Sequence, residues 1–93
     1  MDQPGHAGRS FKAIASDISE GYVTVNPIFL KSFDRDSLKA LYQIVERKQA
    51  EIRSEPFPYH EIQLIRQRNI KLQRLYSAQI VIRNFAREKN MKL

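Results

Sequence analysis

The residues that could do chemistry in this chain are few and lie far apart in the sequence. Of the two histidines, His6 stands near the amino end without a companion ligand, and His60 is followed directly by Glu61. Adjacent residues of a helix face different sides, so His60 and Glu61 do not make a metal site by themselves. The 93 residues include no cysteine, which excludes a thiol nucleophile, a cysteine-ligated zinc site and an iron–sulfur cluster. We therefore expect no cofactor, metal or small-molecule substrate.

Two pairs of carboxylates come close enough in sequence to suggest acid–base chemistry, and both have simpler explanations. Asp34 and Asp36 precede an amphipathic run, where they suit the N-cap and the positive end of a helix. Glu46 and Glu51 lie in a helix face of mixed charge, and nothing places them in a pocket. No glycine begins a phosphate-binding pattern, and no serine stands in a nucleophile elbow. The sequence therefore predicts a protein without enzymatic activity.

A single small domain must position these residues, because 93 residues are too few for two domains. Residues 1–9 contain a proline and two glycines and predict a flexible tail ahead of one helical domain over residues 10–93. Within it we expect helices over about 10–20, 34–54 and 59–89, because apolar residues recur there at helical spacing. Ser10 is a natural N-cap of the first helix, and Gly21 is a natural residue to end it.

The sequence of residues 22–30 indicates a connector rather than a helix. Asn26 precedes a proline and is therefore pushed away from helical backbone angles, so we expect an extended chain. Ile28, Phe29 and Leu30 would anchor the end of this connector on apolar surface. The alternative is a strand that pairs with the sheet of another protein, because a single strand cannot form a sheet alone.

Two prolines separate the predicted long helices. Pro56 and Pro58 remove two backbone donors and end the helix over 34–54, and Pro58 can also open the next helix. A short, stiff connection of this kind favours antiparallel packing. The predicted fold is all-α, with a short N-terminal helix, an extended connector and a proline-linked antiparallel hairpin of two long helices.

The last predicted helix has apolar residues over much of its circumference. We therefore expect burial on more than one side, against a partner protein or a second copy of the chain. The alternative is a helix that ends near Val81, because β-branched residues gather there. The predicted partner surface combines this helix with the connector anchor, and it consists of Ile28, Phe29, Leu30, Leu75, Tyr76, Ile80, Ile82 and Phe85.

The excess positive charge lies in the C-terminal third of the chain. There are 16 Lys and Arg against 10 Asp and Glu overall, and residues 58–93 hold eight of the basic residues with two acidic ones. This asymmetry favours a polyanion or an acidic protein as partner, although a basic face can also serve solubility alone. The alternative function is therefore nucleic-acid binding by the basic C-terminal helix. Its candidate residues are Arg66, Arg68, Lys71, Arg74, Arg83 and Arg87.

The sequence shows no sign of membrane insertion or export. No apolar run approaches the ~18 residues of a membrane span. The first residues are polar and lack the apolar core of a signal peptide. We expect an intracellular protein, either cytoplasmic or associated with the nucleoid or nucleus.

The order of these features resembles the helical domain of the GINS subunits of the replicative helicase complex. The matching pieces are Phe11 to Ile18, Ile28 to Leu30, Leu38 to Ile52 and Glu61 to Ala86. Those subunits usually carry an additional small β-rich domain, which no segment of this sequence matches. The resemblance implies a non-catalytic scaffold subunit in DNA replication that assembles by helix packing. The sequence thus predicts a small helical assembly or adaptor subunit that packs against a partner through its long C-terminal helix.

Overall fold

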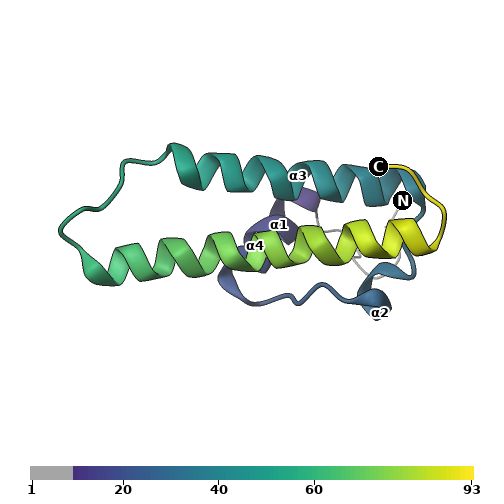
Figure 1. Ribbon diagram of the computed structural model, residues 1–93, viewed down its shortest axis with the longest axis horizontal. Helices are drawn as coiled ribbons and strands as arrows, with labels where there is room; N and C mark the ends of the chain where they lie inside the picture. Colours follow the sequence, from purple (N-terminus) through teal and green to yellow (C-terminus); the bar gives the residue numbers. More distant parts are fainter. Residues whose placement is uncertain (1–9) are drawn as a thin grey trace.

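A computed structural model describes residues 10–93, and all regular secondary structure in this range is helical. The helices are α1 (Phe11–Glu20), α2 (Pro27–Leu30), α3 (Arg35–Ser54) and α4 (Ile62–Glu88). For these residues the all-α prediction is confirmed. Helices α3 and α4 lie side by side in opposite directions. The short helices α1 and α2 pack against only part of the length of this pair (Figure 1). The tail predicted over residues 1–9 lies outside the described residues.

Helix α1 begins and ends where its local chemistry requires. The Ser10 hydroxyl oxygen accepts a hydrogen bond of 3.1 Å from the backbone N–H of Ala13, which caps the first turn. Gly21 has a left-handed conformation with φ of 84°, and its N–H donates to the carbonyls of Asp17 and Ile18. The helix is therefore limited to Phe11–Glu20, close to the predicted range.

The connector is only partly extended, so this part of the prediction is wrong. Pro27–Leu30 forms the one-turn helix α2, with Pro27 at its first position. The side-chain oxygen of Asn26 accepts a hydrogen bond of 2.8 Å from the N–H of Phe29. Asn26 is therefore extended as expected, but it acts as an N-cap, and the proline after it starts a helical turn. Residues 23–26 remain extended, and Val25 among them is buried.

Helix α3 starts with a reciprocal cap. The Asp34 carboxylate accepts a hydrogen bond of 2.8 Å from the N–H of Ser37, and the Ser37 hydroxyl accepts one of 3.0 Å from the N–H of Asp34. The hydrogen bond from the Ser37 backbone lowers the pKa of Asp34 below its usual value of 3.8, because it stabilises the charged carboxylate. This cap accounts for Asp34 without any catalytic role.

Helix α4 is shorter at its start than the sequence predicts. A turn comes first, in which the N–H of Glu61 donates to the carbonyl of Pro58 over 3.1 Å, and the helix begins at Ile62 rather than near residue 59. The chain needs this turn to reverse direction, so Pro58 does not open the helix. At the other end the helix continues past Val81 to Glu88. None of the helices in residues 10–93 is long and apolar enough to cross a membrane.

Most of the hydrophobic core lies in one half of the molecule. We call this half the proximal bundle (residues 10–48 and 71–93), and there α1 contacts both α3 and α4. The buried residues of α4 all lie between Leu75 and Ala86. Beyond the end of α1, the last turns of α3, the loop over 55–61 and the first turns of α4 project as the distal arm (residues 49–70), seen at the left of Figure 1. The fold therefore has one part in which α1 and α2 pack with the two long helices and one part that contains the two long helices alone.

Candidate protein-interaction site

The residues that could do chemistry remain dispersed in the structure. His60 is exposed in the loop between α3 and α4. Glu46 is exposed on α3, and the Glu51 carboxylate lies 3.6 Å from the Nζ of Lys48. Within residues 10–93, no group of three or more His, Asp and Glu side chains is placed to hold a metal ion.

Half of the predicted partner surface lies in the core of the chain itself. Four of its residues have exposed fractions between 0% and 7%, and they are Leu30, Leu75, Ile82 and Phe85. These side chains are covered by the chain's own helices and do not lie at its surface. Phe29 and Ile80 are half-buried. Ile28 and Tyr76 remain at the surface, with 78% and 59% of their area exposed.

Two of the candidate nucleic-acid residues hold α1 against α4. The Nζ of Lys71 lies 3.2 Å from a carboxylate oxygen of Glu20. The Nη1 of Arg74 donates a hydrogen bond of 2.9 Å to the backbone carbonyl of Ser19, near the end of α1. Because these contacts tie down the C-terminal end of a short helix, we assign both residues a structural role.

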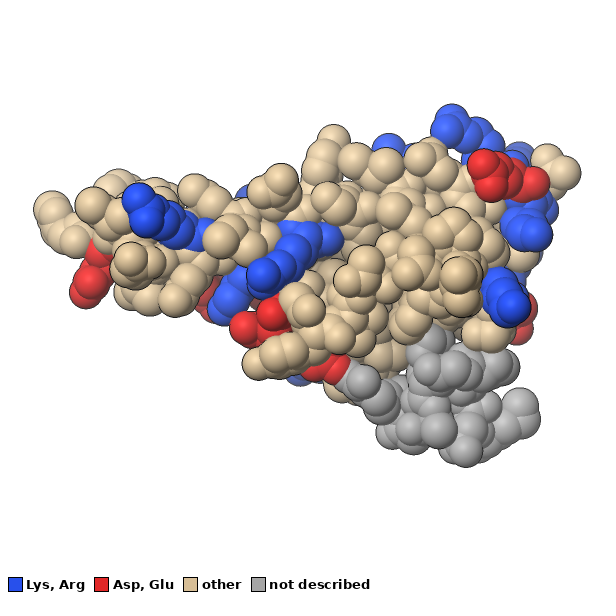
Figure 2. Space-filling view, turned by 90° about the horizontal axis from the view of Figure 1, so that it is seen from below, with Lys and Arg blue, Asp and Glu red and all other residues tan. Residues whose placement is uncertain are grey.

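The other candidate basic residues do not form a continuous stripe. The Arg83 guanidinium donates to the Tyr42 hydroxyl over 3.2 Å, a hydrogen bond that raises the pKa of Arg83. Arg87 donates to the side-chain oxygen of Asn84 over 2.8 Å, whereas Arg66 is exposed. On the face shown in Figure 2 the Lys and Arg side chains lie in separate groups, several of them beside acidic residues. The positive charge is therefore divided among local contacts.

The distal arm carries four large exposed apolar side chains that the sequence prediction did not include. Phe57 and Tyr59 lie in the loop, with exposed fractions of 38% and 77%, and their rings are 4.9 Å apart between centroids. Ile62 and Leu64 follow on the first turn of α4, with exposed fractions of 66% and 48%. We refer to these four residues as the apolar tip.

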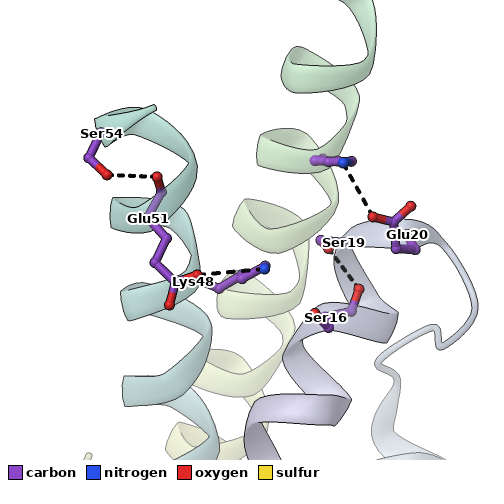
Figure 3. Close-up of polar contacts among 7 residues, drawn as sticks. Ser16, Ser19, Glu20, Lys48, Glu51 and Ser54 are labelled. Carbon is purple, nitrogen blue, oxygen red and sulfur yellow. Dashed lines mark hydrogen bonds and ion pairs between the residues drawn. The ribbon is translucent and has the colours of Figure 1, made fainter. Parts of the chain in front are cut away.

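A groove opens beside the apolar tip, where α1 ends. This distal groove has a volume of about 230 Å³, and its walls come from α3, α4, the loop between them and the last residues of α1. Ser19 and Glu20 close one end of it, and Lys48 extends toward them from α3 (Figure 3). Ile52 and Leu64 contribute apolar surface from the two long helices. The groove thus joins apolar walls with charged side chains.

Arg68 is the least satisfied polar side chain of the groove. Its guanidinium lies over the Phe57 ring, 5.1 Å from the ring centroid, in a cation–π contact. Its Nε atom is buried and has no hydrogen-bond partner within the described part of the chain. A buried donor without an acceptor costs free energy, so the contacts within the chain satisfy the Arg68 side chain only in part.

Comparison with family models, with curated proteins and with solved structures gives no significant match for this chain. The site is therefore interpreted from its own geometry. One signal in the sequence could have indicated the apolar tip. Phe57 stands between two prolines and Tyr59 follows them, so large aromatic side chains occupy a turn, where burial is difficult.

Proposed function

We propose that this chain is a non-enzymatic assembly subunit that binds another protein through its distal arm. The observation that carries the proposal is the apolar tip, in which four large side chains at one end of the molecule are 38–77% exposed. Several large apolar side chains exposed at one end of a monomer leave apolar surface in water, which is unfavourable. A partner that covers the tip would remove this surface.

The position of the tip supports the same proposal. The buried core of α4 lies between Leu75 and Ala86, and no residue from Ile62 to Arg74 is fully buried. The side chains of the apolar tip are therefore not required to hold the proximal bundle together. Interfaces are typically built from aromatic and large aliphatic anchors with a charged rim, and the distal arm combines both.

Matched substitutions test the proposal. Tyr59→Ala and Ile62→Asp alter the tip, whereas Tyr22→Ala and Leu93→Asp make similar changes at side chains that are 79% and 36% exposed elsewhere. The tagged chain is purified from its source extract with nuclease present, and bound proteins are quantified by mass spectrometry. We expect the tip variants to lose a specific partner about tenfold or more, as for interface anchors. Equal retention by all four variants would contradict the proposal.

A second candidate function is nucleic-acid binding at the C-terminal end of α4. Arg83, Arg87 and Lys92 border a shallow depression there, and no acidic residue is among its lining residues. Phosphate contacts would give an affinity that falls steeply with salt, with a slope of about 0.9 per duplex phosphate contact. Changing Arg87 and Lys92 to Gln should then reduce that slope. Absence of binding at about 50 mM salt, where non-specific attraction is strong, would exclude this candidate.

The role in DNA replication that the GINS resemblance implies stays a prediction. It requires a helical subunit that packs against other subunits, which is compatible with an interaction through the distal arm. Recovery of replication proteins with the parent chain, and their loss with Tyr59→Ala, would support it. Recovery of partners from unrelated complexes would contradict it.

A further inference from the structure

The distal groove continues the channel in which α1 lies. In the proximal bundle α1 packs between α3 and α4, with Ile14 and Ile18 buried against them. It ends at Glu20, and the groove starts there, lined by the same two long helices. The position of a third helix is therefore filled in the proximal bundle and vacant along the distal arm. An additional helix would complete the packing.

The charges of the distal arm are arranged in a self-complementary way. Glu61 precedes α4 and makes no capping hydrogen bond through its side chain. Arg68 lies two turns further along with its buried Nε unpartnered. Leu64 lies between them, three residues after Glu61 and four before Arg68, so all three share one face of α4. This face is acidic at one end, apolar in its centre and basic at the other end.

A two-fold axis near Leu64 would match this pattern to itself. In a two-fold interface each contact occurs twice, with the roles of the two copies exchanged. Two antiparallel α4 helices crossing at Leu64 would place Glu61 of each copy beside Arg68 of the other. The carboxylate would pair with the oppositely charged Arg68 guanidinium, and the two Leu64 side chains would cover each other.

We propose that the distal arm is the interface of a two-fold symmetric dimer of this chain. The start of α4 from the second copy enters the distal groove and lies beyond the end of α1. Helices α3 and α4 of both copies then form a four-helix arrangement that covers both apolar tips. This inference rests on the proposed function, because it names the protein partner as a second copy.

The arm is short and offers a small interface, so the dimer should dissociate into monomers at low protein concentration. Stable interfaces usually bury about 800 Å² on each partner, and an arm of two helix ends and a loop is near the lower limit. Sedimentation equilibrium of the purified chain from about 5 to about 500 µM covers the expected range of dissociation constants. We expect a monomer–dimer equilibrium. A monomer across the whole range would overturn the dimer, while the proposed function would survive if a different protein binds the tip.

Charge reversal tests the predicted pairing directly. Glu61→Lys and Arg68→Glu each place like charges together, and each should raise the dissociation constant about tenfold or more. The double variant Glu61→Lys/Arg68→Glu restores opposite charges and should recover dimerisation. Lys39→Glu, an equal charge reversal at an exposed position of α3 in the proximal bundle, is the matched control and should have no effect. Failure of the double variant to recover, with circular dichroism unchanged, would contradict the pairing.

A disulfide provides a second, independent measurement. The chain contains no cysteine, so a single introduced thiol reports only its own position. Leu64→Cys should form a covalent dimer on mild oxidation, because a disulfide requires the two Cα atoms to be within about 7 Å. Lys39→Cys, at an exposed position of α3 in the proximal bundle and treated in the same way, should remain mostly monomeric. Equal cross-linking of both variants would mean that the disulfides form by random collision of monomers, and it would contradict a two-fold axis near Leu64.

Discussion

The proximal bundle and the distal arm are built from the same two helices and differ in what covers them. Leu75 of α4 lies where α1 completes the packing, and it has no exposed area. Leu64 of the same helix lies beyond α1, and it is 48% exposed. The apolar residues of α4 are thus distributed along the whole helix, whereas the third helix covers only part of it. The residues left uncovered are the best candidates for binding another molecule.

The two regions also differ in how their helices begin. Each of the helices that start in the proximal bundle has a side-chain cap, from Ser10, Asn26 and Asp34. Helix α4 starts in the distal arm after Glu61, and no side chain caps it. Uncapped helix ends with few buried contacts open at low free-energy cost. We therefore expect the distal arm to be the less stable part until it is covered by a partner.

A pair of identical substitutions on α4 would measure this difference. Leu75→Ala removes a fully buried side chain and should lower the free energy of unfolding by about 3 kcal/mol. Leu64→Ala removes a half-exposed one and should cost less than about 1 kcal/mol at concentrations where the chain is monomeric. Urea denaturation followed by circular dichroism compares the two. Similar losses would show that the arm shares the core of the bundle.

The residue that ends α1 gives a smaller expected effect. Gly21 has a φ of 84°, and a Cβ at this position would lie 2.9 Å from the Cζ of Arg74. Gly21→Ala should therefore cost about 1–2 kcal/mol, through the left-handed backbone and the displaced guanidinium. Gly21→Asn is the control for backbone strain, because asparagine tolerates this conformation better. If both variants match the parent in thermal unfolding, the end of α1 does not limit the proximal bundle.

The smallest expected effect concerns acid pH and the cap of α3. The hydrogen bond from Ser37 lowers the pKa of Asp34 in the folded chain below 3.8. A lowered pKa stabilises the folded state above the pKa of the unfolded chain, and this contribution disappears as the pH falls through the folded pKa. The urea midpoint should therefore fall slightly more between about pH 5 and about pH 3 in the parent than in Asp34→Asn. An equal fall would mean that the charge of Asp34 adds nothing to the cap.

Much of the fold could be predicted because its signals are local. Ser10 and Gly21 set the two ends of α1 through hydrogen bonds within one turn, and Asp34 sets the start of α3 in the same way. The connector was harder, because Asn26 before a proline fits both an extended segment and an N-cap. Only the observed bond from Phe29 to Asn26 distinguishes them. Four of the eight residues predicted for the interaction site lie in the core, because apolar residues of a core and of an interface look alike in sequence.

The sequence by itself determined the three longer helices and the concentration of positive charge in the last third of the chain. Apolar periodicity, caps and prolines act over a few residues, so they can be interpreted without knowledge of the tertiary structure. Only the tertiary structure decided which part of α4 is covered. That part depends on where the end of α1 lies, and contacts of Lys71 with Glu20 and of Arg74 with Ser19 hold this end against α4. Contacts between residues more than fifty positions apart follow from packing and cannot be derived from local spacing.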